Sequence, residues 1–124
     1  MKLRMKGNSI RMRLSQSEVD ELVDSNVVYE MVNFGKNYLT YQLNLADTKD
    51  VSAVYEKDCI SINIPKVMGS KWAKSDQVGI EEIVSLGAKG SLSILIEKDF
   101  KCLTDRPNED ESNLFENPMN KHDC

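Results

Sequence analysis

The residue types best suited to chemistry in this sequence lie at the two ends of its C-terminal segment. Cys102 opens the segment, and His122, Asp123 and Cys124 are its last residues. Thiolate and imidazole groups are ligands that suit zinc and other late transition metals. Cys102, His122 and Cys124 are therefore candidate ligands of a zinc-like ion, with Asp123, another acid of the segment, Cys59 or water in the fourth position. Their spacing matches no standard zinc finger, and the alternative interpretation is a solvated terminus.

A second candidate site is a row of cations near the start of the chain. Alternate residues of a strand project from one face, and the basic residues alternate with apolar ones. We call this set the cationic face, and its members are Lys2, Arg4, Lys6, Arg11 and Arg13. Five cations together could hold a phosphate, a nucleotide or a nucleic-acid backbone.

Two other interpretations of the cationic face stay open. It is either a solvated sheet face whose charges protect an edge against aggregation, or the electrostatic partner of the acidic C-terminal segment. No aromatic residue is interleaved with the cations to stack on bases, so we do not expect nucleic acid to be the partner.

The sequence contains none of the common catalytic signatures. GxGxxG, GxxxxGK[ST], GxSxG and CxxC motifs are absent, and the single histidine, His122, excludes a multi-histidine metal centre from one chain. Glu81 and Glu82 are adjacent on a predicted strand, where neighbouring side chains point to opposite faces. These observations favour a non-enzymatic protein and assign no catalytic residue.

Length and composition are typical of one soluble domain. The chain has 124 residues, 40% of them hydrophobic and 29% charged, with a net charge of −4. The opening residues lack the apolar run of a signal peptide, and no stretch is long and apolar enough for a membrane helix. Three widely spaced cysteines do not suggest a secreted disulfide framework. We therefore expect a cytoplasmic protein with no membrane partner.

Hydrophobic periodicity predicts an α+β fold. Residues 1–14 form a hairpin that turns at Gly7, or one strand with a bulge there, and Ser15 and Glu18 have capping-box spacing. Helices are predicted at residues 16–25 and 65–74, and strands at residues 27–34, 39–45, 51–55, 60–64, 78–83 and 92–96. Short connections between strands favour antiparallel neighbours, so we expect a mostly antiparallel, curled or barrel-like sheet.

This fold is predicted to occupy residues 1–102 as one domain. Residues 103–124 form an irregular acidic tail that is either draped on the domain or partly disordered. We find no internal repeat in the sequence.

Two stretches of the chain resemble a known family. The first is MKLRMKGNSIRMRLSQSEV at the start, and the second combines EKDFKCL, EDES and NP near the end. Both are similar to a family of small bacterial proteins of unknown function, and the similarity extends over most of the chain. The resemblance implies that the segment around Cys102, Arg106 and Glu109 to Glu111 belongs to the domain. It supplies no catalytic residue.

Together these patterns favour a small, non-enzymatic, cytoplasmic binding or accessory protein with a transition-metal site in its C-terminal tail. The competing hypothesis is a phosphate- or small-ligand-binding domain, enzymatic or not, that uses the cationic face. The metal-site hypothesis implies an ion or another protein as the partner. The cationic-face hypothesis implies a small anionic ligand.

The metal hypothesis predicts that untagged protein carries a bound zinc-like ion, as measured by elemental mass spectrometry. Removing the last three residues should abolish metal binding and leave the core folded, because no strand or helix is predicted beyond Phe100. Binding should also weaken as the pH falls below the range in which histidine titrates, because the ligands must lose their protons. Substoichiometric metal that is unchanged by Cys102→Ser would contradict the hypothesis.

Overall fold

The computed structural model describes residues 1–100, which form eight strands, two α-helices and one short 3₁₀ turn. The elements are β1 (Lys2–Met5), β2 (Ser9–Leu14), α1 (Gln16–Ser25), β3 (Val27–Asn33), β4 (Tyr38–Ala46), β5 (Ser52–Glu56), β6 (Cys59–Pro65), α2 (Lys66–Ala73), β7 (Gly79–Ser85), η1 (Gly87–Lys89) and β8 (Ser91–Lys98). The α+β class, both helices and the hairpin at Gly7 are confirmed.

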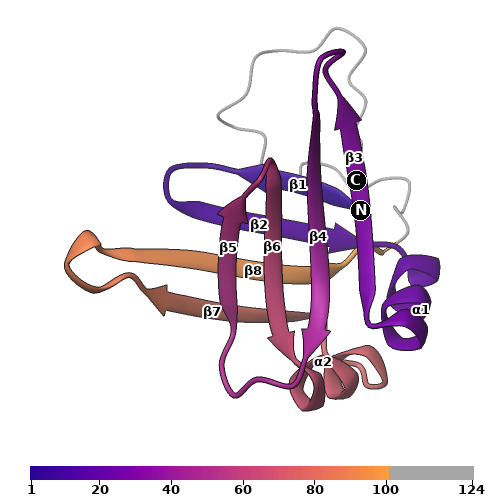
Figure 1. Cartoon of the computed structure of the whole chain (residues 1–124). Coiled ribbons are helices and arrows are strands. Elements are labelled where there is room, and N and C mark those ends of the chain that lie inside the picture. The colour runs from indigo at the N-terminus through magenta and orange to yellow at the C-terminus, as the bar shows by residue number, and fades with distance from the viewer. Residues whose placement is uncertain (101–124) are drawn as a thin grey trace, which may run out of the picture.

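The strands form two separate four-stranded sheets that lie across one another (Figure 1). Sheet A has the order β1-β2-β8-β7, and sheet B has the order β3-β4-β6-β5. The outer pairs of each sheet are antiparallel hairpins, whereas the central pairs, β2 with β8 and β4 with β6, are parallel. The expectation of one barrel-like sheet was therefore wrong, because the strands form two separate mixed sheets. The mostly antiparallel pairing holds for four of the six strand pairs. Short turns predict which strands form hairpins, but they carry no information about how distant hairpins pair.

Both sheets are assembled from two equivalent halves of the chain. β1, β2, α1, β3 and β4 form a ββαββ unit, and β5, β6, α2, β7 and β8 form another. Each unit gives its first hairpin to one sheet and its second hairpin to the other. The two helices connect the sheets in opposite directions and lie at the same end of the molecule (Figure 1).

The strand registers confirm that the halves correspond residue by residue. Lys2 faces Arg13 in the first hairpin, and Ser52 faces Asn63 in its counterpart. The same pairing therefore recurs 50 residues later in the sequence. Four buried pairs have the same separation of 50 residues: Met1 with Val51, Met12 with Ile62, Leu14 with Ile64 and Leu22 with Trp72. In the second hairpin of each unit the separation is 52 for Val28 with Ile80 and 53 for Leu43 with Ile96. The chain is thus an internal structural repeat, which sequence inspection missed because the halves share apolar positions more than residue identities.

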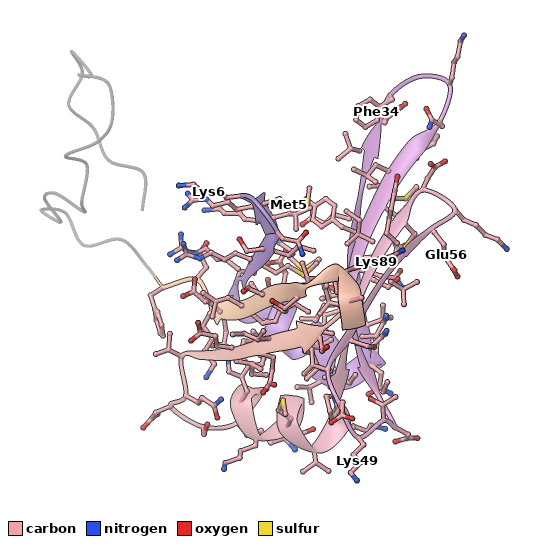
Figure 2. All side chains as sticks on the ribbon, turned by 90° about the vertical axis from the view of Figure 1, so that its left-hand side faces the viewer. Met5, Lys6, Phe34, Lys49, Glu56 and Lys89 are labelled. Atoms are coloured by element: carbon pink, nitrogen blue, oxygen red, sulfur yellow. The ribbon has the colours of Figure 1, made fainter. Side chains whose placement is uncertain are left out.

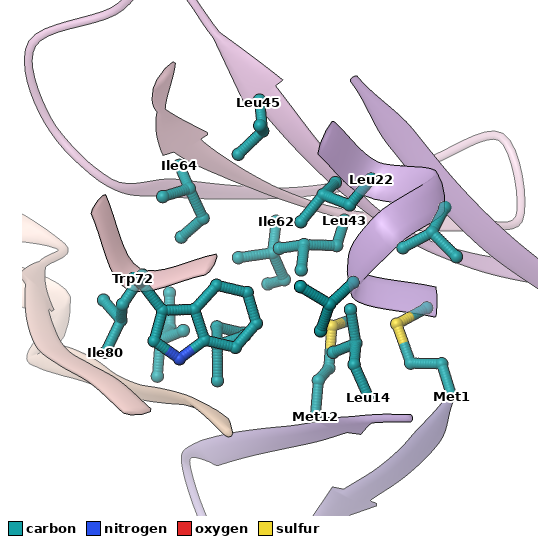
Figure 3. Packing of buried hydrophobic residues seen from close by; sticks show 14 of the residues in the cluster. Met1, Met12, Leu14, Leu22, Leu43, Leu45, Ile62, Ile64, Trp72 and Ile80 are labelled. Atoms are coloured by element: carbon teal, nitrogen blue, oxygen red, sulfur yellow. The ribbon is translucent and has the colours of Figure 1, made fainter. Parts of the chain in front are cut away.

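The core lies between the two sheets and extends beneath the helices (Figure 3). Met12, Ile62 and Ile96 on the central strands are fully buried. Trp72 of α2 is also buried, and its indole N–H donates a 3.0 Å hydrogen bond to the Val78 carbonyl. Trp72 therefore fixes both the position of α2 and the start of the chain's return to sheet A.

Local sequence features explain how each helix begins and how closely it packs. The Ser15 side chain accepts a hydrogen bond from the Glu18 amide, and the Glu18 carboxylate accepts one from the Ser15 amide, so the predicted capping box is confirmed. In α2, Gly69 lies directly against Leu45, where an added Cβ would collide with Leu45 Cδ2. The glycine lowers helix propensity, but it allows α2 to pack onto β4.

Replacing Ile96 by Ala should lower the free energy of unfolding by about 2–5 kcal/mol, because a fully buried side chain leaves a cavity on a central strand. Ile83→Ala is the matched control, since Ile83 is 70% exposed on β7, and its effect should stay within about 0.5 kcal/mol. Urea unfolding monitored by circular dichroism measures both. Equal losses in the two variants would contradict the assignment of the buried face.

Candidate functional site

The structure places the cationic face on the hairpin at the edge of sheet A. Lys2 lies directly opposite Arg13, and Arg4 lies directly opposite Arg11. Lys6 follows β1 at the turn, on the opposite side of the strand from Met5 (Figure 2). Like charges in directly opposed positions destabilise a sheet unless anions compensate them.

Two carboxylates at the end of β8 supply part of that compensation. Arg11 Nε lies 2.8 Å from Glu97 Oε1, and Arg13 Nε lies 3.6 Å from the same oxygen. Asp99 lies 3.2 Å from Lys2 Nζ and 3.9 Å from Arg13 Nη2. Three of the five cations are therefore ion-paired within residues 1–100.

The compensation ends partway along the hairpin. Arg4 and Lys6 form no ion pair with any residue in the described range, and both are exposed. Arg13 Nε is buried and donates no hydrogen bond to any group among residues 1–100. The end of the cationic face near the β1–β2 turn thus keeps positive charge that an anion could contact.

A second ionic cluster joins the start of the chain to α1 and sheet B. The Met1 ammonium contacts the carboxylates of Glu18 and Glu30, and the Tyr41 hydroxyl donates a 3.2 Å hydrogen bond to the Met1 carbonyl. Sequence reasoning identified Glu18 as a helix cap but missed this second role. Glu30 and Tyr41 reach the cluster only because β3 and β4 pair with Glu30 opposite Tyr41.

Burial and charge compete within this cluster. Burial alone would lower the pKa of the Met1 ammonium, but hydrogen bonds and attraction from Glu18 and Glu30 outweigh it and raise that pKa above 8.0. Burial would raise the pKa of Glu18, yet the ammonium and the Ser15 amide lower it below 4.5. Burial, followed by the charges of Glu30 and Glu18, raises the pKa of Tyr41 above 10.0.

An apolar hollow lies between the two sheets, with its lining drawn from both of them. Its volume is about 420 Å³, which lies within the roughly 300–1,000 Å³ range of small-molecule sites. We call it the apolar groove. Its lining residues are Met5, Ile10, Leu39, Ala53, Val54, Tyr55, Ile60 and Leu92. Sequence reasoning missed it because the two walls come from opposite halves of the chain.

The apolar groove lies on the axis that relates the two halves. Met5 corresponds to Tyr55 and Ile10 to Ile60 through the paired hairpin registers, and Leu39 corresponds to Leu92. Met5 and Tyr55 are 55% and 70% exposed, so large apolar side chains meet solvent at its mouth. Exposed apolar side chains that gather around a hollow indicate a binding surface.

Each of the four hairpin turns at this end carries one lysine. They are Lys6, Lys36, Lys57 and Lys89, all exposed. Each lies within three residues of a side chain that lines the groove. The negative charges of Glu56 and Asp58, which flank Lys57, offset part of this positive charge (Figure 2 labels Glu56, Lys6 and Lys89). The rim of the groove is therefore weakly positive.

The predicted metal ligands Cys102, His122 and Cys124 lie outside the described residues. Within residues 1–100, no group of three or more His, Cys, Asp or Glu side chains is arranged to hold a metal ion. Cys59 is partly buried, and its Sγ lies 3.5 Å from Ser61 Oγ. In the same range, no helix has the length and apolar character required to cross a membrane.

The described residues define a class of α+β protein in which two mixed sheets, exchanged between two ββαββ units, enclose an apolar groove. Residues 1–119 match the model of a family of unknown function, DUF7009, and the chain belongs to this family. The resemblance to a family without an assigned activity is thereby confirmed. No curated protein and no solved structure matches the chain.

The ammonium cluster should contribute its full stabilisation between about pH 4.5 and pH 8. The raised ammonium pKa gives stabilisation that is complete below pH 8.0 and lost as pH rises through the folded-state pKa. The lowered Glu18 pKa gives stabilisation that is complete above pH 4.5 and lost as pH falls.

Glu30→Gln tests whether the ammonium cluster causes this pH dependence, because the substitution removes one carboxylate from the Met1 ammonium and keeps the side-chain shape. Urea unfolding at about pH 6 and about pH 10 should show a smaller pH-dependent loss in the variant than in the native chain. Glu21→Gln, on the exposed side of α1, should retain the native pH dependence. An equal change in both variants would rule out the cluster as the cause.

Proposed function

We propose that this protein is a small, non-enzymatic binding protein whose site is the apolar groove. The ligand is an amphipathic anion, in which an apolar chain carries one negatively charged group. The apolar chain occupies the groove between the sheets, and the charged group lies at the rim among the turn lysines. The observation that carries the proposal is a groove of about 420 Å³ with an almost wholly apolar lining and large exposed side chains at its mouth.

The lining supports an apolar chain rather than a polar ligand. Ile10, Ile60, Leu39 and Leu92 offer no hydrogen-bonding side chain, so a polar group at this depth would lose its water without compensation. Each methylene that the groove buries contributes up to about 0.8 kcal/mol. Affinity is thus expected to depend on chain length before it depends on any specific polar contact.

The lysines of the turns support a negative head group. Lys6, Lys36, Lys57 and Lys89 lie one on each hairpin turn, and each is within three residues of a side chain that lines the groove. Exposed ion pairs contribute little individually, typically below about 1 kcal/mol. We therefore expect the lysines to select the sign of the ligand and the groove to provide most of the affinity.

The cationic face and the C-terminal metal ligands remain separate proposals. The anion-binding hypothesis for Lys2, Arg4, Lys6, Arg11 and Arg13 receives less support, because Glu97 and Asp99 already contact three of these side chains. A zinc-like ion held by Cys102, His122 and Cys124 is a separate hypothesis, and these three residues lie outside the described part of the chain.

Calorimetric titration with linear alkyl carboxylates tests the proposal. Dodecanoate should bind more tightly than decanoate by roughly three- to tenfold, because two further methylenes are buried. Dodecanol should bind more weakly than dodecanoate, and this preference should decline in high salt. The isoleucine methyl signals of Ile10 and Ile60 should shift on binding, whereas those of the distant core residue Ile80 should not.

Met5→Ser combined with Tyr55→Ser should weaken dodecanoate binding at least tenfold. Both side chains are more than half exposed, so the core should remain folded. Ile83→Ser is the matched control, since Ile83 is equally exposed but does not line the groove. Binding that is insensitive to chain length, or equal loss in the control, would reject the groove as the site.

A further inference from the structure

We infer that residues 105–111 of this chain bind across its own cationic face, where they supply the anions that the described residues lack at Arg4 and Lys6. The occupant is a named segment of the same chain, and the surface is the outer side of β1 and β2. This interaction surface lies on the other side of β1 from Met5, which lines the apolar groove (Figure 2). It shares only Lys6 with the lysines of the hairpin turns.

The first argument is the position at which the described chain ends. The Asp99 amide donates a 2.8 Å hydrogen bond to the Leu14 carbonyl, and its carboxylate contacts Lys2 and Arg13. Asp99 is therefore already the first acid on the cationic face. The following residues start at the end of that face where Lys2 and Arg13 lie.

The second argument is the gradient of charge along the hairpin. Arg11, Arg13 and Lys2 are paired with Glu97 or Asp99, while Arg4 and Lys6 have no carboxylate partner within residues 1–100. Arg4 directly faces Arg11 across the strands, an arrangement that costs stability unless further negative charge is present. The uncompensated part of the face is the part farthest from Asp99.

The third argument is the sequence of the segment itself. Four acids fall in seven residues, namely Asp105, Glu109, Asp110 and Glu111. An extended chain spans at most about 3.3–3.6 Å per residue, so the six steps from Asp99 to Asp105 reach up to about 20 Å. Arg4 lies only two residues along β1 from Lys2, about 7 Å away. The acids are therefore within reach of the whole hairpin.

The fourth argument is the extent of the family match. It continues to residue 119 and so includes the complete acidic stretch. The segment is therefore part of what defines the family and not an addition to this chain alone. The acidic stretch and the cationic face, which begins where the stretch is attached, are complementary in both charge and position.

Paramagnetic relaxation measured by NMR tests this inference directly. A nitroxide is attached at Ser112→Cys in a chain whose native Cys59, Cys102 and Cys124 are replaced by Ser. The amide signals of β1 should then be broadened much more than those of α2. About 0.5 M salt should remove most of this difference, because it screens exposed charges.

Charge variants identify the surface. Arg4→Gln with Lys6→Gln should abolish the selective broadening, whereas Lys57→Gln with Lys89→Gln should leave it unchanged. Arg4→Glu with Lys6→Glu should also abolish it, and adding Glu109→Lys with Asp110→Lys should restore it. Arg4 and these lysines are exposed, so the substitutions should leave the core folded. The dispersion of the core amide signals checks this.

Three outcomes would overturn the inference. The first is equal broadening of β1 and α2. The second is selective broadening that survives both high salt and the Arg4 and Lys6 substitutions. The third is broadening of isotope-labelled protein by spin-labelled protein that carries no isotope, since it would place the segment on a second copy of the chain.

Discussion

The structure depends on two sets of hydrogen bonds between strands that are far apart in the chain. β2 pairs in parallel with β8, and β4 pairs in parallel with β6, and these contacts turn four separate hairpins into two sheets. A hairpin alone is marginally stable in water, because two strands cannot bury an apolar face. Once the parallel pairs form, Met12, Ile62 and Ile96 occupy the middle of both sheets and are excluded from solvent.

The exchange of hairpins between the two ββαββ units also explains why the ends of the molecule differ. Both helices connect one sheet to the other at the same end, where Leu22 and Trp72 fill the space between them. All four hairpin turns lie away from the helices, and no element among residues 1–100 covers the hollow they surround. The apolar groove is thus a direct consequence of the topology.

Charge is distributed by the same geometry. The parallel pairing of β2 with β8 brings Glu97 beside Arg11 and Arg13, which are more than 80 residues away in sequence. It also brings Asp99 to Lys2. The pairing of β3 with β4 brings Glu30 to the Met1 ammonium, where Glu18 of α1 already lies. The ion pairs among residues 1–100 therefore depend on the tertiary structure, because they join segments that are far apart in the sequence.

The sequence alone was enough to predict those features whose stability depends on residues near one another in the chain. The capping box at Ser15 and Glu18, the turn at Gly7 and the alternation of apolar residues were sufficient to predict both helices and the first hairpin, because their energetics arise within a few residues. The cationic alternation in β1 and β2 was predicted for the same reason. Only the tertiary structure decided the parallel central pairs, the internal repeat, the partners of the cations and the apolar groove. Each of these joins residues from opposite halves of the chain, and their pairing is selected by the burial of a shared core, which no short stretch of sequence contains.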